Sequence, residues 1–108
     1  MLPNGLYSIT FRAGPDGPAG SGVIVLRDGR LLGGDAALFY QGTYQHYDGK
    51  FAVTVQTSRH TDAPSLFGLD NATLSFAGTI IRGIAVGFGA SPQMPDLKFE
   101  VRLVFRAA

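Results

Sequence analysis

Apolar and polar residues alternate along most of this chain with a period of two, which is the spacing of a β-strand that buries one face. The pattern is clearest over 97–106, where apolar residues at odd positions alternate with charged residues and Val104 is the exception. No window of helical length carries apolar residues three and four positions apart, so we expect almost no helix. The alternation predicts strands over residues 5–12, 22–26, 30–32, 38–47, 51–56, 73–80, 83–89 and 97–106.

Strong turn signals separate these predicted strands. Asp28-Gly29 and Asp48-Gly49 are dipeptides that favour two-residue β-hairpins, and the stretch 15–18 contains two prolines that interrupt a strand. Eight short strands joined mostly by hairpin-length loops are typical of an up-and-down antiparallel sheet. Closing that sheet would remove its two exposed edges. We therefore predict an all-β fold, an eight-stranded antiparallel up-and-down β-barrel formed by a single domain over 1–108.

The predicted inward face of the strands is rich in aromatic rings. An eight-stranded barrel is just wide enough to be filled by side chains or to hold one small ligand. We expect the rings to fill most of this space and to leave at most a small cavity. The longest connection, 61–71, is apolar in its middle and is expected to form a lid or plug over an open end. The inward-facing rings are predicted to be Tyr7, Phe11, Phe76, Phe88, Phe99 and Phe105.

The expected structural corner of the barrel includes Gly42 and is centred on Gly33, Gly34 and Asp35. The two adjacent glycines lack Cβ atoms, so the backbone can bend or take positive φ there at little steric cost. The Asp35 carboxylate can accept hydrogen bonds from the backbone amides that follow, which would fix the turn. This capping role is favoured over acid–base chemistry for Asp35.

One face of the predicted strand 38–47 carries Tyr40, Gly42, Tyr44 and His46. The two phenol rings either line a ligand pocket or belong to the core with their hydroxyl groups bonded at the barrel rim. A zinc or iron site usually needs three or four converging ligands, and neither His46 nor His60 has another metal-binding residue at ligand spacing. A structural or solvent-facing role is expected for both histidines.

Small residues dominate the predicted outer face of the strands 73–80 and 83–89. A flat patch without long side chains lets another surface approach closely, which favours self-association. Alternatively, the glycines relieve strain where the sheet coils sharply. The candidate self-association patch comprises Thr73, Ser75, Ala77, Gly83, Ala85, Gly87 and Gly89, with Thr79 beside it.

Composition narrows the class of protein. The 108 residues are 45% hydrophobic and 16% charged, which favours a compact fold over disorder. A net charge of +1 without a basic block disfavours a nucleic-acid surface, and the lack of cysteine excludes disulfides and thiolate chemistry. We find no secretion signal and no apolar run of the ~20 residues that a membrane helix needs. A soluble, cytoplasmic protein is therefore expected.

The sequence gives little support for a catalytic site. No serine occupies a nucleophile-elbow context, and most aspartates fall at turns, where they satisfy backbone amides. The glycine-rich stretch 83–89 has no lysine and no following helix, so it does not match a phosphate-binding loop. We find no combined nucleophile, base and oxyanion donors, and we expect no enzymatic activity, no metal and no cofactor.

The segments 5–11, 20–24, 29–35 and 40–44 read in order Gly-Leu-Tyr-Ser-Ile-Thr-Phe, Gly-Ser-Gly-Val-Ile, a glycine followed by Gly-Gly-Asp, and Tyr-Gln-Gly-Thr-Tyr. In this order and spacing the chain resembles the GrlR-type family of small bacterial proteins. The resemblance implies a lipocalin-like (calycin-like) barrel that forms cytoplasmic homodimers. It also implies repression of type III secretion genes through contact with a transcriptional activator. In that family an acidic loop makes this contact.

The corresponding loop here spans 45–50 and contains one acidic and one basic residue. The candidate partner loop is His46, Tyr47, Asp48 and Lys50. The leading prediction is a non-enzymatic regulator or adaptor that acts by protein–protein contact as a homodimer. The alternative is a small barrel of lipocalin type that binds an apolar ligand. Its candidate lining is Tyr7, Phe11, Tyr40, Tyr44, Phe76, Phe88 and Phe99.

Overall fold

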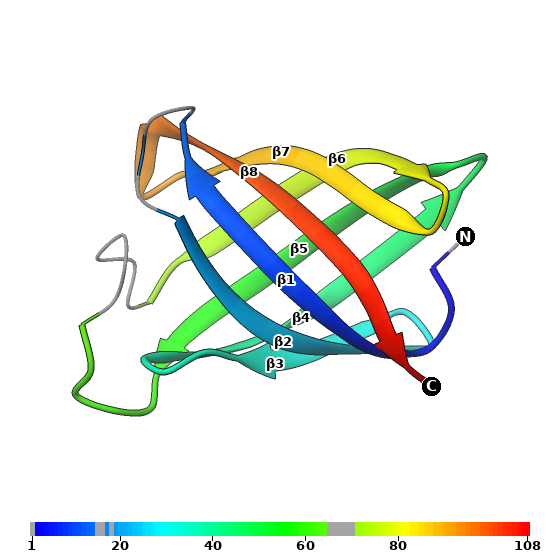
Figure 1. The fold of residues 1–108 in the computed structure, drawn as a ribbon. Coiled ribbons are helices and arrows are strands. Elements are labelled where there is room, and N and C mark those ends of the chain that lie inside the picture. Colours follow the sequence, from blue (N-terminus) through cyan, green and yellow to red (C-terminus); the bar gives the residue numbers. More distant parts are fainter. Residues whose placement is uncertain (1, 15–16, 18, 65–70) are drawn as a thin grey trace.

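The computed structural model describes residues 2–14, 17, 19–64 and 71–108. Eight antiparallel strands follow one another around a closed barrel, and the last strand pairs with the first (Figure 1). Because every strand has two neighbours, the barrel confirms the predicted fold class. The strands are β1 (Gly5–Ala13), β2 (Ala19–Arg27), β3 (Arg30–Gly34), β4 (Leu38–Tyr47), β5 (Lys50–Arg59), β6 (Thr73–Ile81), β7 (Ile84–Ser91) and β8 (Met94–Ala107).

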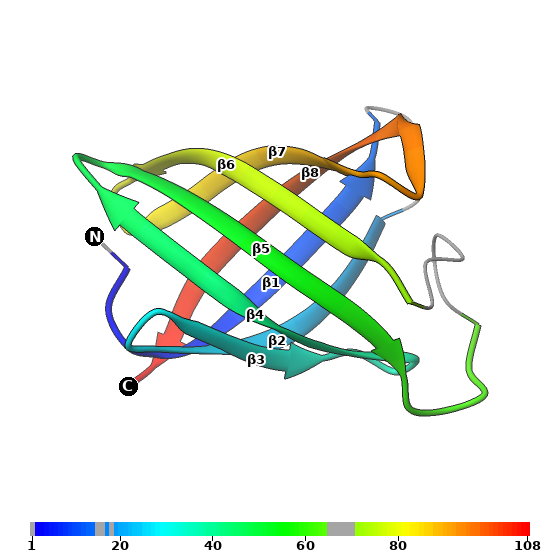
Figure 2. The same cartoon turned by 180° about the vertical axis from the view of Figure 1, so that it is seen from behind.

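The two ends of the barrel differ in their connections. Both chain termini and the β2–β3, β4–β5 and β6–β7 hairpins lie at one end, here called the terminus end (Figures 1 and 2). The other connections lie at the opposite end, here called the corner end. The three hairpin turns have φ values between 49° and 87° at both central residues, the geometry that lets a two-residue turn follow the strand twist. These turns are Asp28-Gly29 and Asp48-Gly49, as predicted, and Arg82-Gly83.

The terminus end is closed by the segment that precedes β1. Leu2 is buried, and its N–H donates a hydrogen bond of 2.8 Å to Nδ1 of His46 on β4. The hydroxyl group of Tyr7 donates to the carbonyl oxygen of Pro3 at 2.6 Å. Leu26, which pairs with Gly5 at the start of β1, is fully buried. The burial of Leu2 and the bonds made by Leu2 and Pro3 therefore hold this segment across the terminus end.

Strand β7 has the opposite orientation to the one that its sequence pattern predicts. Ala85 is 0% exposed and Phe88 is 64% exposed. A Cβ added to Gly87 would lie 2.8 Å from Cζ of Phe51, and one added to Gly89 would lie 2.8 Å from Cδ1 of Phe76. The predictions that Phe88 points inward and that Ala85, Gly87 and Gly89 point outward are wrong. The physical reason is space, because rings from other strands occupy the room that larger β7 side chains would need.

Phe105 keeps the predicted inward parity of β8, because it pairs with the inward-facing Tyr7, but it lies at the end of the barrel and is only partly covered. Its side chain is 38% exposed at the terminus end, where its ring lies edge-on to that of Tyr7 with centroids 5.4 Å apart. The β1–β8 register shifts between Leu6 and Tyr7, next to this pair. By contrast, Tyr7, Phe76 and Phe99 are buried as predicted, and Phe11 is half-buried.

Candidate functional site

Asp35 fixes the corner between β3 and β4. Its Oδ1 accepts hydrogen bonds from the backbone N–H groups of Ala37 and Leu38, both at 2.8 Å. The Asp35 N–H donates to the carbonyl oxygen of Leu38 at 2.9 Å, which closes the turn. The predicted capping role is therefore confirmed. The second carboxylate oxygen, Oδ2, accepts a hydrogen bond from the hydroxyl group of Tyr40.

Burial and the bond to Asp35 together keep Tyr40 protonated. Burial, the hydrogen bond to Asp35 and the negative charge of Asp35 together raise the pKa of Tyr40 far above that of a free tyrosine. Each of these causes disfavours a phenolate. Tyr40 is therefore a neutral hydrogen-bond donor, and its proton is directed to the carboxylate.

The corner glycines are needed for close strand contact rather than for positive φ. A Cβ on Gly33 would lie 2.2 Å from the carbonyl oxygen of Val23, and one on Gly42 would lie 2.0 Å from that of Thr54. Gly34 is also crowded, by the carbonyl oxygen of Leu38 at 2.8 Å. A larger residue at Gly33 or Gly34 would push neighbouring strands apart at the corner, whereas Gly42 lies within β4, where it pairs with Leu31 and Val55.

The corner is bonded to the chain that leaves β5. The His60 N–H donates to the carbonyl oxygen of Ala37 at 3.0 Å, and the Thr61 hydroxyl donates to that of Ala36 at 2.6 Å. His60 Nε2 also lies 2.8 Å from the carbonyl oxygen of Asp35. These bonds join the two connections on this side of the corner end. The predicted lid or plug over 61–71 depends on 65–70, which lie outside the described residues.

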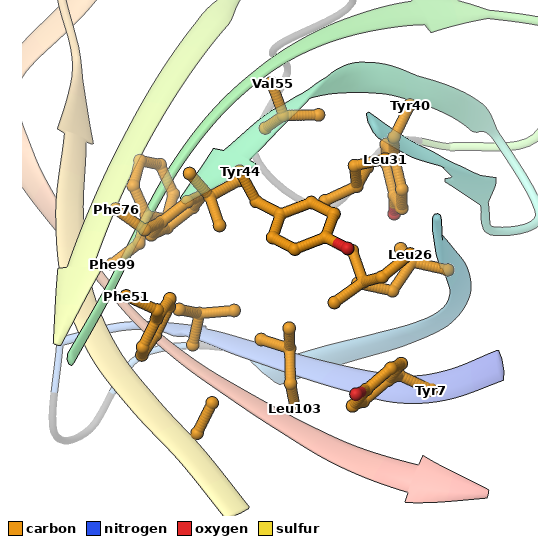
Figure 3. Packing of buried hydrophobic residues seen from close by; sticks show 14 of the residues in the cluster. Tyr7, Leu26, Leu31, Tyr40, Tyr44, Phe51, Val55, Phe76, Phe99 and Leu103 are labelled. Carbon is orange, nitrogen blue, oxygen red and sulfur yellow. The ribbon is translucent and has the colours of Figure 1, made fainter. Parts of the chain in front are cut away.

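A cavity of about 70 Å³ lies inside the barrel. Its lining includes residues from the corner-end parts of several strands, among them Phe11, Leu38 and Leu74. The size agrees with the prediction of at most a small cavity. Figure 3 shows the rings of Phe51, Phe76 and Phe99 gathered on one side of the interior. The further lining residues are Ile9, Ile24, Leu31, Asp35, Tyr40, Val53, Val55, Thr57, Val101 and Leu103.

Four predicted lining residues are in the right place and three are not. Phe11, Tyr40, Phe76 and Phe99 contact the cavity. Phe88 lies on the outer surface. Tyr7 and Tyr44 are buried, but they belong to the packed terminus-end half rather than to the cavity lining. Thr57, Val55 and Leu74 share the inward parity of their strands, and that parity was the only sequence signal for them.

The tyrosines divide between the two alternatives that the sequence left open. Tyr40 lines the cavity, whereas Tyr44 is a core ring whose hydroxyl group donates to Oδ1 of Asn4 at 3.3 Å. Tyr7 is likewise a core ring with a bonded hydroxyl group. Burial, with a smaller effect of Tyr44, raises the pKa of Tyr7 to about 12.

The candidate partner loop is partly structural. His46 is half-buried, accepts the Leu2 N–H and contacts the Tyr44 ring edge-on with centroids 5.7 Å apart. The predicted structural role of His46 is thus confirmed. Tyr47 is 59% exposed, and Asp48 lies in the β4–β5 turn. Lys50 is exposed at the start of β5. Among the described residues, no three His, Asp or Glu side chains come together as metal ligands would.

A second candidate site, here called the outer apolar band, lies on the outer surface of β1 to β4. Leu6, Val25 and Leu32 stand side by side, because Leu6 pairs with Val25 and Val25 pairs with Leu32. Val23 and Phe39 flank them across Gly34, which pairs with both. These five side chains are 36–51% exposed. Sequence reasoning missed the band because the run 23–26 is apolar on both faces.

The predicted self-association patch is only partly assembled. Ser75 and Ala77 are exposed on the outside of β6, and Thr73 is half-buried there. Gly83 lies in the β6–β7 turn, and the three remaining members face the interior. Phe88 stands next to Ala77 on the outer surface instead.

The fold and cavity define the class of structure, an eight-stranded up-and-down antiparallel barrel with a small apolar cavity. Comparison with protein-family models and with curated proteins gives no match for this chain. The resemblance to the GrlR-type family therefore stays a prediction. Within the part of the chain that the structure describes, there is no helix of the length and apolarity needed to cross a membrane.

Proposed function

We propose that this protein is a non-enzymatic regulator or adaptor that forms a homodimer and acts by protein–protein contact. The outer apolar band is the observation that supports the proposal. The GrlR-type resemblance extends it to a bacterial cytoplasmic regulator of type III secretion genes.

The physical basis is the continuity of the band. Isolated apolar residues are normal on protein surfaces, whereas contiguous exposed apolar patches mark interaction sites. Leu6, Val25 and Leu32 form an unbroken row across three strands, and Phe39 adds an aromatic ring beside it. Covering such a row removes apolar surface from water, which stabilises the contact by ~25 cal/mol per Å² buried. A second copy of the same row offers a matching apolar face, as an isologous dimer requires.

Light scattering coupled to size-exclusion chromatography tests this proposal. We expect the wild-type protein to elute as a dimer and Leu32→Asp to elute as a monomer. Thr43→Asp is the matched control, because Thr43 is exposed on neighbouring β4 outside the band and its variant should remain a dimer. A wild-type protein that stays monomeric at high concentration would refute the homodimer.

The Phe88→Ser variant locates the contact independently. Phe88 is on β7, on a different part of the barrel surface from the outer apolar band. If contact is made through the band, Phe88→Ser should leave the dimer intact. If Phe88→Ser becomes a monomer while Leu32→Asp remains a dimer, the dimer interface lies on β6 and β7 instead.

A second candidate function is the binding of a small apolar ligand inside the barrel. The observation that favours it is the cavity of about 70 Å³. Native mass spectrometry of the freshly purified protein tests this function. An adduct that disappears on denaturation would support it, and the absence of both an adduct and displaceable binding of small apolar probes would remove it.

A further inference from the structure

The wall of the cavity is apolar except on one side. Of its described lining residues, three have polar side chains: Asp35, Tyr40 and Thr57. Asp35 lies in the β3–β4 corner, while Tyr40 and Thr57 are paired residues on β4 and β5. These three polar side chains therefore lie on neighbouring parts of the barrel wall.

The hydroxyl protons of this polar side are already used within the protein. Tyr40 donates its proton to Oδ2 of Asp35. The Thr57 hydroxyl donates to the carbonyl oxygen of Ala72 at 3.5 Å and accepts from the Ala72 N–H at 3.2 Å. Both hydroxyl groups are therefore directed to acceptors of the protein rather than to a ligand.

Acceptor capacity remains on the same side. An ionised carboxylate has about four lone-pair positions. In Asp35, Oδ1 accepts from Ala37 and Leu38, and Oδ2 accepts from Tyr40, which leaves a position on Oδ2. The phenol oxygen of Tyr40 also keeps lone pairs while its proton is donated. The described wall can thus accept hydrogen bonds from a ligand.

The charge of the cavity wall also favours a ligand that donates hydrogen bonds. The described lining contains no Lys, Arg or His, and its one ionisable carboxyl group is Asp35. A bound anion would lose its hydration, gain no donor from this side and meet a negative charge. A ligand with an N–H or O–H group would instead pair with the free acceptor positions.

We propose that the cavity binds a small apolar molecule with one hydrogen-bond donor group, such as an amine, amide or alcohol, and discriminates against carboxylates. This inference rests on the second candidate function, and it adds the chemical class of the ligand. A cavity of about 70 Å³ has room for roughly five to seven non-hydrogen atoms, because one water-sized atom needs ~10–15 Å³.

An isosteric pair of probes tests the predicted preference for a neutral donor group over a carboxylate. Pentanamide and pentanoate have the same apolar body and nearly the same shape, but only the amide donates hydrogen bonds. We expect NMR titration of the full chain to show pentanamide binding at least tenfold more tightly than pentanoate, with 1-hexanol also binding. Contacts between bound pentanamide and the methyl groups of Val55 and Leu74 would place it in the cavity.

Variants on β5 and at the corner provide the controls. Val55 points into the cavity and Thr54 points outward, so Val55→Phe should abolish binding and Thr54→Phe should leave it unchanged. Asp35→Asn keeps a capping oxygen but removes the charge and adds an N–H donor. It should reduce the preference for pentanamide over pentanoate to less than threefold. Circular dichroism verifies that each variant is folded.

The outcomes distinguish a failure of this inference from a failure of the second candidate function. If no probe binds, both the second candidate function and this inference fail. If the amide and the carboxylate bind equally well in the cavity, ligand binding stands and the donor preference is overturned. Binding without contacts to Val55 or Leu74 would place the ligand elsewhere and would also overturn the inference.

Discussion

The hydroxyl group of Tyr40 donates a hydrogen bond to Asp35, whose other carboxylate oxygen caps the β3–β4 corner. One carboxylate therefore holds the turn and fixes the ring of a residue five positions further along the chain. Since Tyr40 lines the cavity, the shape of the corner and the polarity of the interior depend on the same side chain.

Removing this carboxylate should destabilise the fold. We expect Asp35→Ala to lower the free energy of unfolding by at least about 3 kcal/mol, because two backbone N–H groups and one phenol lose their acceptor, each at ~1–3 kcal/mol when buried. Tyr40→Phe keeps the turn cap and should cost only about 1–2 kcal/mol. Urea unfolding measures both. Equal losses in the two variants would contradict the capping role.

Alkaline pH should weaken the fold through Tyr7. Its pKa is raised to about 12 in the folded protein, whereas a tyrosine in the unfolded chain titrates near 10. The unfolded state therefore releases this proton first, so the contribution is complete below about pH 10 and is lost as the pH rises to about 12. At ~1.4 kcal/mol per pKa unit, the loss is about 2–3 kcal/mol.

Denaturant titrations across this pH range, together with phenolate absorbance, measure the effect. Tyr7→Phe should reduce the slope, and the slope that remains belongs to Tyr40, whose pKa is raised as well; the variant also starts less stable because it loses the bond to Pro3. Tyr47→Phe is the control, since Tyr47 is exposed, and its variant should follow the wild-type curve. An unchanged slope in Tyr7→Phe would assign the alkaline loss to another group.

The inward orientation of β7 predicts a packing penalty. Gly87→Val should cost about 1–3 kcal/mol, the usual cost of overpacking, because its Cβ would meet the ring of Phe51 at 2.8 Å. Thr79→Val, on the exposed outside of β6, should change stability by less than ~0.5 kcal/mol. Thermal and urea unfolding compare the two variants. If Gly87→Val were as harmless as its control, β7 would have to face the other way.

The plug at the terminus end should loosen when its anchor is removed. His46→Leu deletes the acceptor of the Leu2 N–H. We expect amide hydrogen exchange at Leu2 to become roughly fivefold faster, which corresponds to a net hydrogen-bond contribution of ~1 kcal/mol. His60→Leu, at the opposite end of the barrel, should leave exchange at Leu2 unchanged. Identical exchange rates in wild type and His46→Leu would show that packing alone holds the segment.

The sequence predicts this fold well wherever one strand face is clearly apolar and the other clearly polar. The β4 range was predicted to the residue, as were the Asp28-Gly29 and Asp48-Gly49 turns and the capping by Asp35. These features depend on local chemistry: the parity of a strand, the positive φ of a turn, and a carboxylate beside free amides.

The errors arise where the local pattern of residues does not indicate which face of a strand is buried. In β7 the even positions are apolar and the odd positions are small, and only the rings of Phe51 and Phe76 decide which set fits inside. The run 23–26 is apolar at every position, so it could not indicate that Val23 and Val25 are exposed. The bond between Tyr40 and Asp35 also depends on a ring orientation that spacing does not specify.

Because of the cavity, the two ends of the barrel should compress differently under pressure. Hydrostatic pressure favours states in which water fills internal voids, and here the void adjoins the corner end while the terminus end is tightly plugged. Compression should therefore hydrate the interior from one side, and amides near Leu38 and Leu74 should respond before those near Tyr7. The response of this barrel to pressure should therefore differ between its two ends.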